Sequence, residues 1–132
     1  MNTDKDFAPY QPSLDMKELG FDEECLAIHS FVDGELNFMY VNTFHSNDDV
    51  NEKSAAAPLY QQAFRWFREK YKLYHTIKMF GDWDKPQYSY LVSGRTMTNP
   101  AHMWHYEYKD SHEEAELECL KKLIEIVKNN NK

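Results

Sequence analysis

A chain of 132 residues with 42% hydrophobic and 15% aromatic side chains can close one hydrophobic core and is too rich in core-forming residues to be disordered. No segment reaches the apolar length that crosses a bilayer, and the polar residues 1–6 lack the pattern of a targeting signal. We therefore predict a single domain, residues 1–132, in the cytoplasm and without a membrane partner.

Charge is distributed unevenly along the chain, whose formal net charge is −7. Residues 1–57 hold three basic and twelve acidic side chains, a net charge of −9, whereas residues 58–132 hold twelve basic and ten acidic ones, a net charge of +2. Such an acidic half is typical either of a well-solvated, loop-rich segment or of a surface that faces a partner.

The first predicted element is a short helix. Residues 1–12 contain Pro9 and Pro12 and no period, so we expect a loose tail. Ser13 is a suitable N-cap for the helix that follows, and Gly20 suits its C-terminal end.

A hairpin is predicted next, so that residues 13–44 form a short helix and a hairpin. The runs 25–31 and 36–44 have strand composition and flank Asp33 and Gly34, which tolerate the positive φ of a tight turn. Residues 45–57 lack both the helical and the strand period, and we expect a mobile loop there.

Residues 58–132 are predicted to form an α-β-β-β-α core. Pro58 suits a first helical turn, and aromatic residues recur at helical spacing after it. Ser111 and Glu114 have the form of a capping box before a second long helix. The predicted strands cover residues 73–80, 87–93 and 103–108.

The complete order is α-β-β, loop, α-β-β-β-α. Consecutive strands joined by short turns pair antiparallel, and an amphipathic helix buries its apolar stripe on a sheet. The sequence thus predicts an α+β fold in which two long amphipathic helices cover one face of an antiparallel sheet.

Two resemblances accompany this fold. The sequences of residues 58–71 and 113–124 resemble a family of short uncharacterised proteins from phages, prophages and Bacteroides-type gut bacteria. That resemblance implies a mobile-element setting and transfers no site residues. The α-β-β-β-α order is similar to that of the double-stranded RNA-binding domain, but the lysine cluster of its second helix is replaced here by Glu113, Glu114 and Glu116.

No pattern in the chain indicates a catalytic residue, a metal site or a cofactor. His102 and His105 are three apart on a predicted loop and strand, where no carboxylate or cysteine completes a ligand set. The pair of Asp48 and Asp49 has no visible partner carboxylate, and no glycine-rich phosphate loop is present. Cys25 and Cys119 are interpreted as reduced core thiols, with a disulfide as the alternative; the chain is not predicted to be an enzyme.

Aromatic side chains are concentrated on the predicted strands of the second half. Either they line one sheet face as a binding platform, or they pack under the helices or under the N-terminal hairpin. These residues are Tyr88, Tyr90, Trp104, Tyr106 and Tyr108.

Two functions are consistent with the sequence. The first is a non-catalytic accessory or protein-interaction module of a mobile element, which binds an unidentified protein through its acidic surface or its aromatic patch. The alternative is a nucleic-acid-binding protein, whose basic face would lie on the first long helix. Its residues are Arg65, Arg68, Lys70 and Lys72, which also fit an ordinary solvated face. The oligomeric state stays open.

Overall fold

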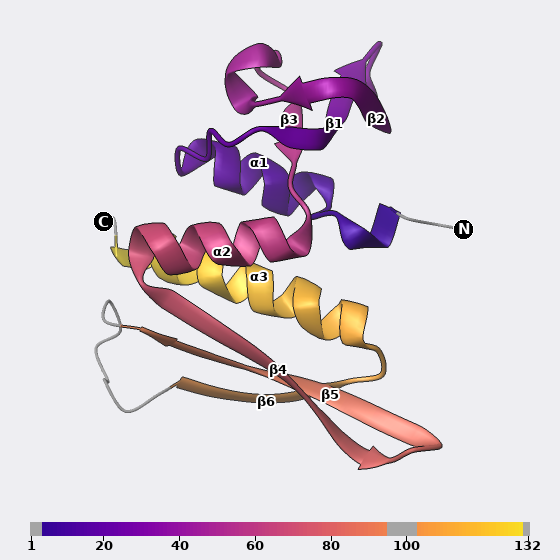
Figure 1. The fold of residues 1–132 in the computed structure, drawn as a ribbon, viewed down its shortest axis with the longest axis vertical. Coiled ribbons are helices and arrows are strands. Elements are labelled where there is room, and N and C mark those ends of the chain that lie inside the picture. The colour runs from indigo at the N-terminus through magenta and orange to yellow at the C-terminus, as the bar shows by residue number, and fades with distance from the viewer. Residues whose placement is uncertain (1–3, 95–102, 131–132) are drawn as a thin grey trace. The chain divides into compact units, whose positions relative to one another are not determined.

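The computed structural model describes residues 4–94 and 103–130, except the side chains of residues 4, 42, 103–107 and 130. It confirms the α+β class and the order of helices and hairpins (Figure 1). The chain divides into two compact units, Met1–Ala63 and Phe64–Lys132. This boundary coincides with the change in charge, because the first unit carries a net charge of −9 and the second +2.

The first unit contains helix α1 (Tyr10–Glu18) and a three-stranded antiparallel sheet. Its strands are β1 (Cys25–Val32), β2 (Glu35–His45) and β3 (Ala55–Ala57), in the spatial order β2-β1-β3. A short 3-10 helix, η2 (Asn47–Asp49), connects β2 to β3.

Helix α1 ends in the left-handed glycine motif that the sequence predicts. Gly20 has a φ of 98° and donates its N–H to the carbonyl of Lys17, while the N–H of Phe21 donates to the carbonyl of Met16. These two bonds satisfy carbonyls that the helix end would leave unpaired. Met16 and Phe21 are both fully buried, so the motif also anchors the chain in the core of the unit.

Residues 7–12 are more ordered than the predicted tail. Phe7 is buried and bridges to Leu59, and the N–H of Ala8 donates to the carbonyl of Pro58. Helix α1 begins at Tyr10, three residues before the predicted start, because proline is tolerated in a first helical turn. Ser13 is therefore not the N-cap, and its buried hydroxyl donates to the carbonyl of Ala8.

Residues 45–57, where a mobile loop is predicted, contain the two regular elements η2 and β3. The three alanines of β3 are fully buried and pair with Ala27, Ile28 and His29 of β1. Their small side chains suit a strand packed closely beneath other elements, although an alanine run carries neither period. The preceding turn is held by Lys17, whose Nζ donates to the carbonyls of Asn51 and Ser54 at 2.7 Å each.

Asn47 joins three parts of the first unit. Its side-chain amide donates to the carbonyl of Phe21 at 2.8 Å and accepts from the N–H of Ala56 at 2.8 Å. The two bonds connect η2 to the end of α1 and to β3.

We expect Asn47→Ala to lower the free energy of unfolding by about 1–3 kcal/mol, because it leaves a part-buried donor and acceptor unpaired. Asp48→Ala, at the exposed neighbouring position, is the matched control and should change it by less than ~0.5 kcal/mol. Equal effects of the two substitutions on the unfolding free energy, measured by urea titration, would show that the Asn47 side chain does not stabilise the connection of η2 to α1 and β3.

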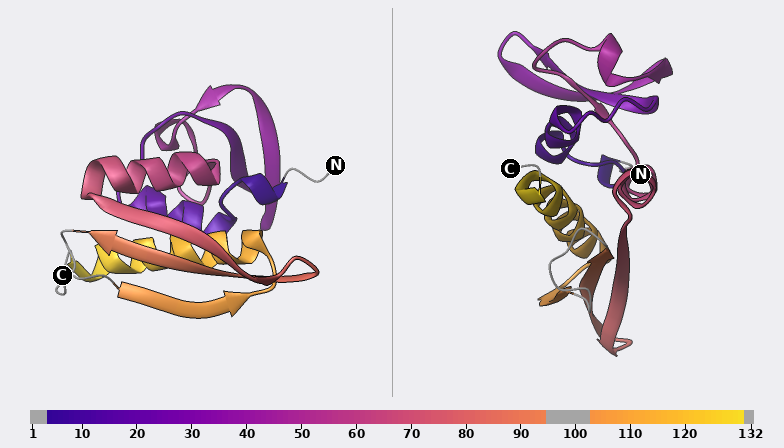
Figure 2. Two further views of the ribbon diagram at one scale, coloured as in Figure 1. Left: turned by 60° about the horizontal axis from the view of Figure 1, so that its bottom comes forward. Right: turned by 90° about the vertical axis from the view of Figure 1, so that its left-hand side faces the viewer.

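The second unit is a three-stranded antiparallel sheet with helices on one side. Helix α2 (Tyr60–Tyr71) crosses the unit boundary, and β4 (Leu73–Asp82), β5 (Lys85–Gly94) and β6 (Met103–Lys109) follow in the spatial order β4-β5-β6. Helix α3 (His112–Asn130) packs along the sheet. Figures 1 and 2 show α3 and the second half of α2 on the same side of it.

The core of this unit consists of the helix stripes that the sequence predicts. Phe67 of α2 and Leu120 and Leu123 of α3 are at most 1% exposed. Ser111 caps α3 as predicted, since its hydroxyl accepts the N–H of Glu114 at 3.1 Å. That all 132 residues unfold as one cooperative domain stays a prediction.

Candidate protein-interaction surface

The β1–β2 hairpin is built around the turn that the sequence predicts. Asp33 and Gly34 have φ values of 53° and 82°, and Val32 pairs with Glu35 on either side of them. Two successive positive φ values define the turn type whose twist matches that of the two strands. The turn therefore fixes the pairing register as far as Ala27 and Tyr40, beyond which the register shifts at a bulge.

The surface of this hairpin is apolar to an unusual degree. Large side chains on both strands are between 39% and 59% exposed. Side chains alternate between the two faces of a strand, so Leu36 and Tyr40 lie on one face of the hairpin and Val32 and Met39 on the other. Exposed apolar groups on a small protein can mark an interaction site. The residues are Leu26, Val32, Leu36, Met39, Tyr40 and Phe44.

The sequence in and around the hairpin is strongly acidic. Residues 18–52 contain nine acidic side chains and neither lysine nor arginine. Two of the three basic residues of the first unit, Lys17 and Lys53, flank this range; Lys17 holds the 51–54 turn, and the Lys53 ammonium lies 5.3 Å from the ring centre of Phe31. A partner that covers the hairpin therefore meets apolar and acidic groups and, beside Phe31, the Lys53 ammonium.

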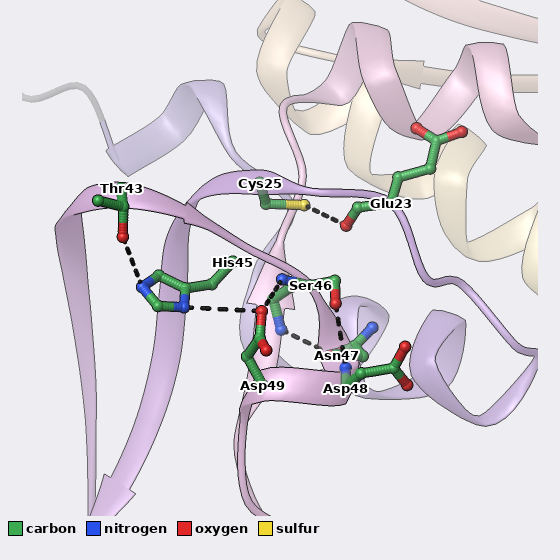
Figure 3. Close-up of polar contacts among 9 residues, drawn as sticks. Glu23, Cys25, Thr43, His45, Ser46, Asn47, Asp48 and Asp49 are labelled. Atoms are coloured by element: carbon green, nitrogen blue, oxygen red, sulfur yellow. Dashed lines mark hydrogen bonds and ion pairs between the residues drawn. The ribbon is translucent and has the colours of Figure 1, made fainter.

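Three side chains at the end of β2 have the order hydroxyl, imidazole and carboxylate (Figure 3). Thr43 Oγ1 lies 3.0 Å from His45 Nε2, and His45 Nδ1 lies 3.8 Å from Asp49 Oδ2. The second distance exceeds a hydrogen bond, and the side chains of His45 and Asp49 are 38% and 55% exposed, so water competes at each group. This arrangement lacks the buried, oriented carboxylate that activates a nucleophile.

The same carboxylate has a structural role. Asp49 Oδ2 accepts the N–H of Ser46 at 3.2 Å, and the hydroxyl of Ser46 accepts the N–H of Asp48, which together form a capping box at η2. Asp48 and Asp49 thus belong to the start of a short helix, where negative charge is stabilising.

Both cysteines are buried, reduced thiols, as the sequence predicts. Burial, and secondarily the charge of Glu23, raises the pKa of Cys25 to about 12. Its thiol donates to the Glu23 carbonyl (Figure 3). Burial, and secondarily Glu116, also raises the pKa of Cys119. Neither thiol has the depressed pKa of a nucleophile.

The four basic residues proposed for nucleic acid do not form one face. Arg65 and Arg68 are exposed and three residues apart, so they share one side of α2. Lys70 points elsewhere, because its ammonium lies 5.0 Å from the ring centre of Trp66 and 5.6 Å from that of Tyr71. Lys72 follows the helix with a φ of 58°, in the left-handed conformation.

The described strand aromatics do not gather on a single exposed platform. Tyr90 is 5% exposed, and Tyr88 is half-buried with its ring against His112. Tyr108 is 51% exposed and contacts Phe80 edge-on. The side chains of Trp104 and Tyr106 lie outside the described residues. For Tyr90, packing in the core is confirmed.

His75 of β4 is a half-buried titratable group in the second unit. Its ring stacks on Phe64 with the centroids 3.7 Å apart. Burial lowers the pKa of His75 to about 4, and the nearby charge of Arg68 acts in the same direction. The folded protein therefore holds this imidazole neutral.

Because the pKa of His75 is lowered in the folded protein, we expect the protein to lose stability in mild acid. The unfolded chain binds a proton near pH 6.5 but the folded chain only near pH 4, so protonation favours unfolding as the pH falls through this window. We expect His75→Phe, which keeps a ring on Phe64, to lose less stability than the natural chain between about pH 7 and about pH 4.5. Unfolding free energies are measured by urea titration of both proteins at the two pH values. Equal losses in the two proteins would contradict a neutral His75 in the folded state.

Within residues 4–94 and 103–130, no group of three or more His, Cys, Asp or Glu side chains is placed to hold a metal ion. No helix of this part of the chain combines the length and apolar character that crossing a bilayer requires. His102, and the side chain of His105, fall outside the described residues.

Comparison of the chain with protein-family models, with curated proteins and with solved structures gives no match.

Proposed function

We propose that this chain is a non-catalytic protein-interaction module whose acidic N-terminal unit binds a basic partner protein. One observation carries the proposal: the exposed apolar side chains of β1 and β2 lie in a 35-residue stretch, residues 18–52, without lysine or arginine. Apolar contacts supply affinity in such an interface, while opposite charge on the partner speeds association and selects against acidic competitors.

The cellular setting belongs to the same proposal. The resemblance of residues 58–71 and 113–124 to short phage and prophage proteins supports an accessory role for a mobile element in the cytoplasm. Small accessory modules of this kind need a recognition surface and no active site.

Photo-crosslinking tests the proposal. Tyr40, 53% exposed on β2, is replaced by p-benzoylphenylalanine in the full chain and irradiated in cells of the source organism. We expect one discrete adduct with a protein of basic character. Trp83, 90% exposed in the second unit, is the matched control and should give no comparable adduct. The proposal fails if position 40 gives no adduct, or if position 83 gives the same one.

A nucleic-acid-binding role is the second candidate, and the exposure of Arg65 and Arg68 on one side of α2 favours it. Against it, Glu113 and Glu114 occupy the first turn of α3, where negative charge repels phosphate. We expect duplex RNA to bind no more tightly than ~0.1 mM at physiological salt. Micromolar binding that Arg65→Glu and Arg68→Glu weaken would favour this second candidate.

A further inference from the structure

The sheet of the first unit has an inner face that its own chain covers. Ala27 and His29 of β1 are buried, and side chains two apart on a strand share a face. Phe7 packs against Ala27 and Phe38, and the ring of Tyr10 contacts that of His29 edge-on. The inner face is therefore covered by the segment that leads into α1 (Figure 1).

The outer face carries the alternate side chains of the same strands. Leu26, Ile28 and Val32 of β1 belong to it, and Met39 of β2 lies directly opposite Ile28. Leu26, Val32 and Met39 are 45%, 49% and 39% exposed. The solvated face of an antiparallel sheet is ordinarily polar, whereas Ser30 is the one polar residue of β1 on this face. An exposed apolar face of this kind is typical of an interaction site.

The three lysines of the first unit belong to the inner side of the sheet. The Lys53 ammonium lies over the ring of Phe31, which shares the inner face with Ala27 and His29 by alternation. Lys17 is on α1 and binds carbonyls of the turn before β3, and Lys5 lies two residues before the buried Phe7. The outer face is thus the side of the hairpin away from these cations.

Acidic side chains lie at the turn end of the outer face. Glu35 pairs with Val32 and therefore shares its face, and Asp33 lies in the turn itself. An apolar face with carboxylates at its end is complementary to an apolar surface with basic neighbours.

Charge also selects between two kinds of occupant. A second copy of the chain would bring two units of net charge −9, and the Glu35 carboxylate of each, against one another. A segment of a basic protein with apolar side chains on one side and lysine or arginine on the other instead contacts the apolar and the acidic groups together.

We infer that the outer face of the β1–β2 hairpin, centred on Leu26, Ile28 and Met39, binds a basic amphipathic segment of the partner protein. This inference rests on the proposed function and assigns the face that the partner covers. The partner's apolar side chains contact the centre of the face, and its basic side chains lie near Asp33 and Glu35.

The test measures fluorescence anisotropy of a short labelled peptide, in which lysine and valine alternate, with the full chain. We expect saturable binding that weakens as salt is added. Met39→Lys should weaken it about tenfold or more, because it places a cation at the centre of the outer face. Leu36→Lys, at a 43% exposed position on the inner face of the same strand, makes the same change of charge and should have a smaller effect.

Two further arms use the unchanged chain, so that they are independent of folding defects. A peptide with serine in place of valine keeps its charge but loses its apolar contacts, and should bind at least about tenfold more weakly. Nuclear magnetic resonance that resolves methyl groups reports which face is covered. The lysine–valine peptide should shift the methyl signals of Leu26, Ile28 and Met39 more than those of Leu36.

The assigned face is overturned if the lysine–valine peptide does not bind, or if Met39→Lys and Leu36→Lys weaken binding equally. It is also overturned if the serine peptide binds as tightly as the valine peptide, or if the methyl signals of Leu36 shift most. A dimer of the chain alone that Met39→Lys dissociates would overturn it as well, because a second copy then covers the face. An adduct at position 40 in any of these cases would leave the proposed function standing, whereas its absence would remove both.

Discussion

Phe67→Ala is expected to lower the free energy of unfolding by about 3–5 kcal/mol. Phe67 is fully buried on α2, and its ring contacts Trp66 edge-on at 5.0 Å and Tyr71 at 5.9 Å between centroids. Truncation removes the transfer free energy of the ring and leaves a cavity that the surrounding helix and sheet cannot fully close.

The measurement is urea denaturation followed by far-ultraviolet circular dichroism. Arg65→Ala, at an exposed position two residues earlier on the same helix, should change the unfolding free energy by less than ~0.5 kcal/mol. Phe67→Leu should fall between the two, which keeps the comparison measurable if the alanine variant unfolds. A loss below ~1 kcal/mol for Phe67→Ala would show that the core is assigned to the wrong stripe.

Phe21→Ala is expected to have an effect of the same size, about 3–5 kcal/mol, in the first unit. Phe21 is 1% exposed and follows the glycine that ends α1, where its side chain is buried together with that of Met16. The substitution removes a fully buried ring and leaves a cavity in the core of this unit. Asp22→Asn, at the next and exposed position, is the control.

This variant also tests whether the chain unfolds as one domain. The three tryptophans, at positions 66, 83 and 104, all belong to the second unit, so their fluorescence reports on that unit. One cooperative domain predicts that Phe21→Ala shifts the fluorescence transition as far as the circular dichroism transition. A fluorescence transition that stays in place would show two independently unfolding domains.

Local signals predicted much of the fold. The Asp33-Gly34 turn, Gly20 after α1 and Ser111 before α3 each work through the backbone conformation or hydrogen bond that their residue type provides. Such features depend on a few neighbouring residues, which is why the sequence alone identifies them.

Long-range pairing was not predictable in the same way. Strand β3 consists of three alanines whose partners in β1 lie almost thirty positions earlier, and Phe7 is fixed by Leu59. Neither an alanine run nor a lone phenylalanine indicates its distant partner. The place of β2 at the end of the order β2-β1-β3 depends on this pairing, because β3 occupies the opposite side of β1.

The predicted basic face is only partly present. Arg65 and Arg68 share a side of α2, but the ring contacts of Lys70 separate its ammonium from them. The acidic excess of the first half, by contrast, was visible in the sequence and coincides with a structural unit.

Nuclear magnetic resonance of the ¹⁵N-labelled full chain tests most directly whether binding occurs through the acidic first unit. The chain is titrated with a short peptide in which lysine and valine alternate, as a probe for a basic partner. In a separate experiment it is titrated with duplex RNA at physiological salt. We predict that the peptide shifts the amide signals of Leu36, Phe38 and Tyr40, whereas RNA causes no saturable shift in the micromolar range. Saturable RNA-induced shifts at Arg65 and Arg68, with the β2 amides unmoved by the peptide, would contradict the account.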